Sequence, residues 1–150
     1  MKKKNGFTLV ELLAVIVILA IILVIAVPQI MDTINSSRKA SIESSVKMVA
    51  SSAETQYTVA QTLGNLGTGE GQFNVGSTES KVSCLTEKWA GLNSSDYASC
   101  EYYIDANGVA HVDITGKTGG KFAGYTCTNG DKTTATCNKG WLSNSVCRHK

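Results

Sequence analysis

An apolar run near the N-terminus constrains this chain more than any other feature. Every residue from 12 to 27 is apolar, and the run extends back to Phe7 with two interruptions, Thr8 and Glu11. A helix needs about 20 apolar residues, at about 1.5 Å each, to cross the roughly 30 Å hydrocarbon core of a bilayer. Residues 7–27 reach that length, so the sequence predicts a membrane-spanning helix surrounded by the lipid bilayer.

The flanks of the run indicate whether it stays in the protein and which way it faces. A secretory signal peptide ends at a small-residue cleavage site, whereas Val27, Pro28 and Gln29 close this run. The helix is therefore expected to remain as an anchor. Lysines at positions 2–4 precede it, which predicts a cytoplasmic N-terminus and an extracytoplasmic remainder.

Glu11 is the one residue that does not fit a simple anchor. A carboxylate inside a membrane segment costs roughly 2–3 kcal/mol on insertion scales and is a functional-site candidate by default. On position alone, an interfacial glutamate without a role near the helix end is an equally good interpretation.

Residues 6–13 (GFTLVELL), preceded by lysines and followed by the apolar run up to Pro28, resemble the prepilin signature of type IV pilins and type II secretion pseudopilins. The resemblance covers under a quarter of the chain. It implies cleavage between Gly6 and Phe7 by a membrane prepilin peptidase, followed by N-methylation of Phe7. It also implies that Glu11 neutralises the terminal amine of a neighbouring subunit during assembly, and that the helix can unwind near Pro28.

Elementary electrostatics agrees with that interpretation. Cleavage after Gly6 would leave a positive amine on Phe7, four residues from Glu11. Opposite charges attract strongly where the dielectric constant is low, and each is costly to bury alone. Glycine at the cleaved position also lets an extended backbone enter a protease cleft without a side-chain clash. A functional Glu11 is thus favoured over one without a role.

After Pro28 the sequence continues as an amphipathic helix, because apolar residues recur at spacings of three and four. They are Ile30, Ile34, Ile42, Val46, Val49, Ala53, Tyr57 and Ala60. One long helix is expected from about Thr8 to Leu63, with Gly64 and Asn65 as its C-cap. Its first half would lie in lipid, and its second half would pack on a globular head.

The second half of the chain predicts a small antiparallel sheet, and hence an α+β fold. Residues 101–104 and 109–114 alternate as strands do, and Asn107-Gly108 between them is a strong hairpin signal. A third strand is expected over 122–127. Residues 64–80 predict an exposed loop, and residues 81–91 fit a short helix or a strand equally well.

All five cysteines lie beyond residue 80, which is typical of a domain folded in an oxidising compartment. They are Cys84, Cys100, Cys127, Cys137 and Cys147. Two disulfides and one spare thiol are expected, and the spacing alone leaves fifteen arrangements open. Cys84–Cys100 is the bridge predicted first. Without a C-x-x-C motif, and with two histidines far apart, a zinc site is the weaker interpretation.

Charge and motifs exclude other classes. The formal net charge is +2, but without the lysines at positions 2–4 the acidic residues slightly outnumber the basic ones, which disfavours bulk nucleic-acid binding. No hydrolase, metalloprotease or P-loop motif occurs. We therefore expect no enzymatic activity, no cofactor and no metal. Residues 115–150 are basic and residues 7–114 acidic, a pattern that indicates either a solvated surface or a dipolar subunit.

The sequence thus predicts a leader at residues 1–6, an assembly helix at 7–28, a stem at 29–63 and a disulfide-stapled head at 64–150. The favoured function is a subunit of a type IV pilus or pilus-like filament, held in the cytoplasmic membrane and then assembled at the cell surface or in the periplasm. Its partners would be copies of itself or other pilins, the prepilin peptidase, and an assembly platform with its ATPase. The alternatives are a pseudopilin of a secretion or DNA-uptake machine and a tethered binding domain that never polymerises.

Overall fold

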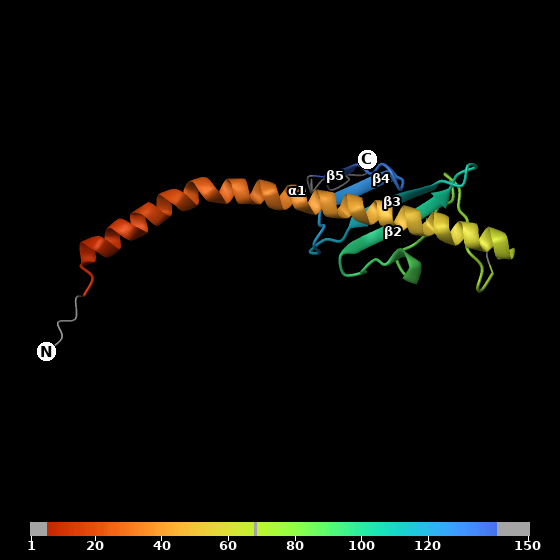
Figure 1. Cartoon of the computed structure of the whole chain (residues 1–150), viewed down its shortest axis with the longest axis horizontal. Coiled ribbons are helices and arrows are strands. Elements are labelled where there is room, and N and C mark those ends of the chain that lie inside the picture. The colour runs from red at the N-terminus through yellow and green to blue at the C-terminus, as the bar shows by residue number, and fades with distance from the viewer. Residues whose placement is uncertain (1–5, 68, 141–150) are drawn as a thin grey trace, which may run out of the picture. The chain divides into compact units, whose positions relative to one another are not determined.

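The computed structural model describes residues 6–67 and 69–140. Its elements, in chain order (Figure 1), are α1 Leu9–Leu63, β1 Val82–Ser83, a short 3-10 helix Lys88–Ala90, β2 Tyr97–Ile104, β3 Ala110–Gly116, β4 Tyr125–Gly130 and β5 Cys137–Lys139. This is the expected α+β class, a long N-terminal helix with a small antiparallel sheet. The chain divides into two compact units, residues 1–37 and residues 38–150.

The helix α1 ends where its C-cap was predicted. Gly64 has a φ of 68°, a left-handed conformation that glycine adopts without a steric penalty. The backbone N–H of Asn65 donates to the carbonyl oxygen of Ala60 at 2.8 Å. That bond from the second residue after the helix back to its last turn is the Schellman arrangement, which satisfies a carbonyl that the helix itself leaves unpaired.

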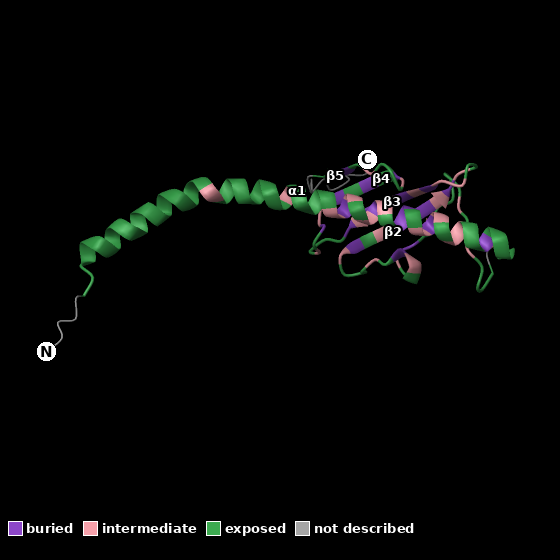
Figure 2. Cartoon of the chain, viewed as in Figure 1, coloured by how far each residue is buried: buried purple, intermediate pink, exposed green. Residues whose placement is uncertain are grey.

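In the second unit, α1 buries one stripe against the sheet (Figure 2). Its buried residues are Ile42, Val46, Val49, Ala50, Ala53 and Ala60. The predicted stripe is correct from Ile42 onward. It is wrong for Ile30 and Ile34, which are 56% and 40% exposed. Both residues belong to the first unit. All strand residues that form the hydrophobic core belong to the second unit.

The sheet has five strands in the order β1-β2-β3-β4-β5, with every neighbouring pair antiparallel. The predicted hairpin is present: Ile104 pairs with Ala110 across a turn in which Gly108 has a φ of 81°. In β3, buried positions alternate with partly exposed ones, because successive side chains of a strand point to opposite faces. The inward face packs on α1.

Two details of the predicted sheet are wrong. The expectation of three strands did not include β5, and it left open whether residues 81–91 contain a strand, where β1 lies. The two strands β1 and β5 are only two and three residues long. The strand expected over 122–127 instead runs from Tyr125 to Gly130. Phe122 lies in the preceding turn, where it is buried and stacks on Tyr97 with ring centroids 5.2 Å apart. Its aromatic character reflects core packing rather than strand pairing.

The ambiguous segment and the predicted loop are both settled by the structure. Residues 81–91 contain a strand and a helix, namely β1 and the 3-10 turn. In the described part of residues 64–80, the chain is irregular apart from one isolated bridge between Leu66 and Phe73. This loop leads from the end of α1 back to the edge of the sheet at β1.

Candidate functional site

The first half of α1 presents apolar side chains on all sides. Its most apolar window has no buried residue, and its length and composition suffice to cross a membrane. Nearly all of its residues up to position 34 are exposed (Figure 2). A helix that is hydrophobic all round is normally buried in a protein core or in a membrane. The length and composition of this segment therefore fit a membrane-spanning anchor.

Glu11 occupies the first turn of this apolar helix and closes its N-terminus. Its Oε2 accepts hydrogen bonds from the Thr8 backbone N–H at 2.8 Å and from the Thr8 hydroxyl at 2.9 Å. In return, the Thr8 Oγ1 accepts a bond from the Glu11 backbone N–H at 3.3 Å. This reciprocal pattern is a capping box, which satisfies N–H groups that have no partner within the helix.

The sequence prediction had missed this role of Thr8. The signal was present, since Thr-x-x-Glu immediately before an apolar run is the sequence form of a capping box. Glu11 therefore has a local structural role within a single chain, in addition to any role between chains. The cap also holds the carboxylate at Thr8, directly beside Phe7 in the sequence.

Gly6 and Phe7 both precede the helix. Phe7 is 89% exposed, and a Cβ atom added at Gly6 would meet no atom within 4 Å. The peptide bond between them is therefore accessible and outside helical hydrogen bonding. Of the predicted leader, residues 1–6, only Gly6 is among the described residues.

Pro28 lies inside α1. Proline lacks a backbone N–H, so the turn around it has one hydrogen bond fewer than a regular helix. Just after it, the hydroxyl of Thr33 donates to the carbonyl oxygen of Gln29 at 3.0 Å, a type of bond that often bends helices. A shallow depression of about 330 Å³ lies along Gln29 and Thr33. The helix nevertheless continues through Pro28 without a break.

The structure pairs Cys84 with Cys100 and Cys127 with Cys137. The first is the bridge predicted first, and Cys147 lies outside the described residues. Each disulfide fastens a short edge element to its neighbour. Cys84 directly follows β1 and binds it to β2, while Cys127 and Cys137 are opposite partners on β4 and β5. Strands of two and three residues have few ladder bonds of their own, so the disulfides anchor both edges.

No group of three or more histidine, cysteine or acidic side chains that could hold a metal ion occurs within residues 6–67 and 69–140. The residues singled out by the sequence fall into two separate sets: Gly6, Phe7, Glu11 and Pro28 in the first unit, and the disulfides in the second. The first set is an exposed peptide followed by an apolar helix with an acidic residue in its N-terminal cap.

Comparison with protein families agrees with the features of this first set. Residues 1–27 match the family model of the prokaryotic N-terminal methylation motif. The chain thus carries the signature of type IV prepilins, and the match supports a protein of the type IV pilin-like and pseudopilin class. Searches of curated proteins and of solved structures gave no significant match.

Proposed function

We propose that this chain is a structural subunit of a type IV pilus or pilus-like filament, processed between Gly6 and Phe7 and polymerised through its N-terminal helix. The observation that carries the proposal is a carboxylate, Glu11, in the first turn of an apolar helix that the rest of the described chain leaves uncovered. A plain membrane tether could cap this helix with an uncharged glutamine, so it is the charge of Glu11 in an apolar segment that points beyond an anchor.

Processing is the first step of the proposed function. The exposed peptide after Gly6 suits a membrane prepilin peptidase, and cleavage turns the amide nitrogen of Phe7 into a charged amine. Methylation of that amine keeps its positive charge. Because Glu11 already accepts a hydrogen bond from the Thr8 N–H, its carboxylate lies one residue away from the new charge.

Assembly is the second step. Before it, lipid covers the apolar residues of α1, with the N-terminus in the cytoplasm and the head outside the membrane. An assembly platform and its ATPase would then transfer the helix from the bilayer into a bundle of equivalent helices. In that bundle each Phe7 amine needs a counter-charge, because leaving one partner of a buried ion pair unmatched costs about 3–5 kcal/mol. Glu11 of a neighbouring subunit supplies it.

Intact mass spectrometry of sheared surface material from cells expressing the chain tests this function. The expected mass is that of residues 7–150 with one added methyl group. A filament-free culture, or a surface species that still carries the lysine-rich start or is cleaved near Pro28, would contradict the proposal. Gly6→Leu is a suitable control, because Gly6 precedes α1 and is not part of the core of the head; it should block processing without destabilising the head.

A further inference from the structure

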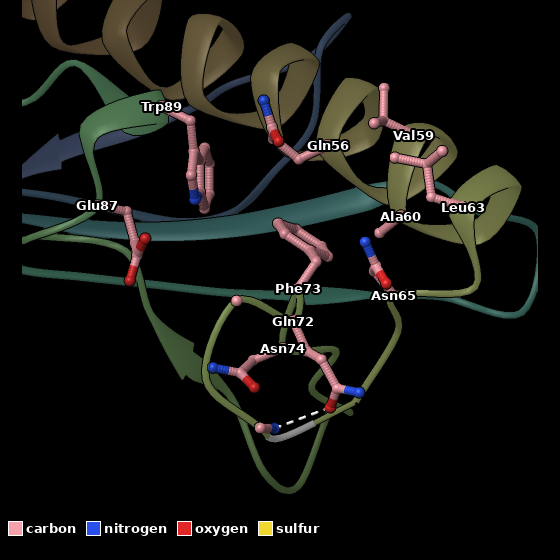
Figure 3. A pocket seen from close by; sticks show the side chains of 12 residues that line it. Gln56, Val59, Ala60, Leu63, Asn65, Gln72, Phe73, Asn74, Glu87 and Trp89 are labelled. Atoms are coloured by element: carbon pink, nitrogen blue, oxygen red, sulfur yellow. Dashed lines mark hydrogen bonds between the residues drawn. The ribbon is translucent and has the colours of Figure 1, made fainter.

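A cavity of about 470 Å³ lies beside the C-terminal end of α1. The last turns of the helix, the loop that follows it and the 3-10 helix line it, and it is open to solvent on one side (Figure 3). The whole cavity belongs to the second unit. Its size falls within the range of about 300–1,000 Å³ that is typical of small-molecule sites.

The polar part of the wall consists mainly of carboxamides. Side chains of Gln56, Asn65, Gln72 and Asn74 line the cavity together with the carboxylate of Glu87. A carboxamide both donates and accepts hydrogen bonds, whereas a carboxylate only accepts them. No lysine, arginine or histidine is among the residues that line the cavity. This wall matches a ligand that is uncharged and carries groups that both donate and accept, as hydroxyls do.

The apolar part of the wall contains two aromatic side chains beside Val59, Ala60 and Leu63. Phe73 and Trp89 lie with ring centroids 5.8 Å apart, and both rings pack on Tyr102. Tyr102 is only 2% exposed, and its hydroxyl donates to the backbone carbonyl of Asn74 at 2.5 Å. Two aromatic side chains at the cavity are thus fixed to the core of the sheet, and do not have to be ordered when a ligand binds.

Asn74 also has an unused hydrogen-bonding group. Its Oδ1 is buried and has no hydrogen-bond partner within the described part of the chain. A buried acceptor without a partner is unfavourable and calls for a specific explanation. Asn74 lines the cavity, so a ligand bound there would be a suitable partner for its amide.

We propose that this cavity binds one or two units of a neutral saccharide. The apolar C–H face of a sugar ring would pack on Trp89 and Phe73, while its hydroxyls would pair with Glu87 and with the carboxamides other than Gln72. The Gln72 Oε1 already accepts a hydrogen bond from the Gly69 N–H at 2.9 Å (Figure 3). An anionic ligand would meet the Glu87 carboxylate without any cation in the wall, and a purely apolar ligand would leave the carboxamides unpaired. Binding at this site does not depend on filament formation.

The test uses the full chain in a zwitterionic detergent without a sugar headgroup, since a maltoside would compete for the site. The chain has two tryptophans, so Trp141→Phe leaves Trp89 as the only one. Its fluorescence is followed during titration with lactose, cellobiose, chitobiose and N-acetylglucosamine into the millimolar range. Inorganic phosphate and the dipeptide Ala-Phe are titrated alongside as an anionic and a peptide probe. At least one saccharide should give a saturable change, and neither comparison probe should do so.

Two glutamines on the same helix provide a matched pair of variants. Gln56 lines the cavity and Gln61 does not, although both lie on α1. Gln56→Ala should weaken binding of the saccharide about fivefold through the loss of one hydrogen bond, and Gln61→Ala should leave it unchanged. The proposal is wrong if no saccharide binds saturably, if Ala-Phe or phosphate binds more tightly than every sugar, or if both variants have the same effect.

Discussion

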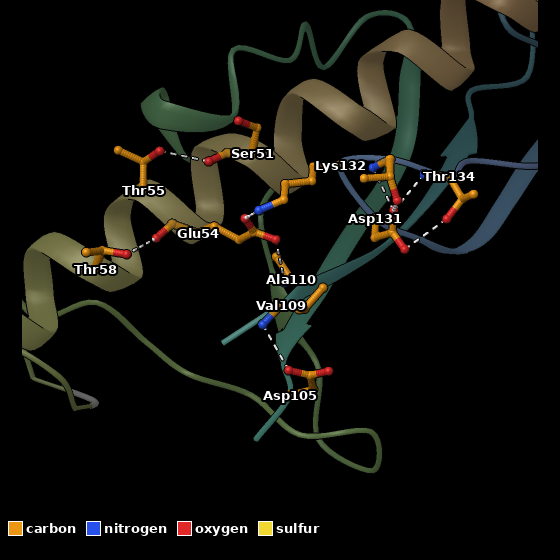
Figure 4. A network of polar contacts seen from close by, with 11 residues as sticks. Ser51, Glu54, Thr55, Thr58, Asp105, Val109, Ala110, Asp131, Lys132 and Thr134 are labelled. Atoms are coloured by element: carbon orange, nitrogen blue, oxygen red, sulfur yellow. Dashed lines mark hydrogen bonds and ion pairs between the residues drawn. The ribbon is translucent and has the colours of Figure 1, made fainter. Parts of the chain in front are cut away.

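Glu54 on α1 binds two partners, the side chain of Lys132 and the backbone of Ala110 in β3 (Figure 4). The two partners differ in how far they are exposed to solvent. Its Oε2 accepts a bond from the Lys132 Nζ at 2.7 Å, and its Oε1 accepts one from the backbone N–H of Ala110, a buried residue, at 3.3 Å. The Glu54 side chain is 15% exposed, and that of Lys132 is 53% exposed. The lysine can therefore be hydrated when unpaired, whereas the Ala110 N–H depends on the glutamate.

This asymmetry leads to a prediction for the two partners. Glu54→Ala should lower the free energy of unfolding of the head by about 2 kcal/mol, because it leaves a buried N–H without its acceptor. Lys132→Ala should lower it by less than about 1 kcal/mol, the usual value of an exposed ion pair. Urea unfolding of both variants, followed by circular dichroism, measures the difference. Equal losses would show that the ion pair, not the backbone contact, provides the stability.

Asp131 gives the neighbouring loop a dependence on pH. Hydrogen bonds from the Thr133 hydroxyl, and then from the backbone N–H groups of Thr134 and Thr133, hold the pKa of the Asp131 carboxyl well below its usual value of 3.8. A carboxyl whose pKa is lower in the folded state stabilises the fold above its unfolded pKa, and this stabilisation disappears as the pH falls through the folded pKa.

The head should therefore lose stability as the pH falls below about 4. Asp131→Asn removes the titrating group. The variant should therefore be less stable than the unaltered protein at neutral pH, and acidification should lower its free energy of unfolding by a smaller amount. Unfolding by urea at neutral pH and in acid, for both proteins, tests this. If the two proteins lose the same amount on acidification, Asp131 is not a source of the pH dependence.

The short strands β1 and β5 depend on covalent support. An edge strand of two or three residues forms few ladder bonds, and the two disulfides attach these edges to β2 and β4. In the chain-entropy model, a cross-link that closes a loop of this length stabilises a protein by about 3 kcal/mol.

Replacing both Cys127 and Cys137 by serine should thus lower the free energy of unfolding by about 2–4 kcal/mol. The loss of order should be confined to the β4–β5 edge, while β2 and β3 retain their pairing. Hydrogen exchange of backbone amides can locate the change, and non-reducing peptide mapping of the unaltered protein should find Cys84–Cys100 and Cys127–Cys137. A map with other pairings, or five free thiols, would overturn the disulfide assignment.

Local features of the sequence were predictable, and long-range pairing was less so. The helix end at Gly64 and the hairpin at Asn107-Gly108 depend on the conformations of one or two residues. The edge strands β1 and β5 leave no periodic signal in two or three residues, and the role of Phe122 depends on Tyr97, which is remote in sequence. The cavity could not be predicted either, because three separate segments build it.

The candidate processing site was predictable for a different reason. Gly6, Phe7 and Glu11 lie in one short stretch, so their chemistry follows from sequence order and from the run that follows. The structure adds Thr8 as the local partner of Glu11. The extent of the packed stem was also mispredicted, because the spacing that marks an apolar stripe does not reveal where the sheet ends.

The whole chain combines an uncovered apolar helix with a compact head. Removing residues 1–28 should give a soluble and mainly monomeric protein, because the main apolar surface for self-association is lost and the remaining helix buries its stripe against its own sheet. Gel filtration with light scattering measures the mass. A stable oligomer of this fragment would mean that the head carries a large interface of its own.

The capping box makes it possible to separate the charge of Glu11 from its structural role. Glutamine can replace glutamate in a capping box, so Glu11→Gln keeps the helix terminus but removes the counter-charge for the Phe7 amine. Thr8→Ala does the opposite, because it removes the cap hydroxyl and keeps the carboxylate. The two variants therefore test charge pairing and helix capping independently.

The decisive measurement compares these two variants, each as the sole copy in its strain, by immunoblots of membranes and of sheared surface fractions. Glu11→Gln should be inserted and cleaved normally but be missing from the sheared fraction, since an unmatched amine costs about 3–5 kcal/mol at each subunit addition. Thr8→Ala should still assemble. A normal yield of surface filaments from Glu11→Gln would contradict assembly through pairing of the Glu11 and Phe7 charges.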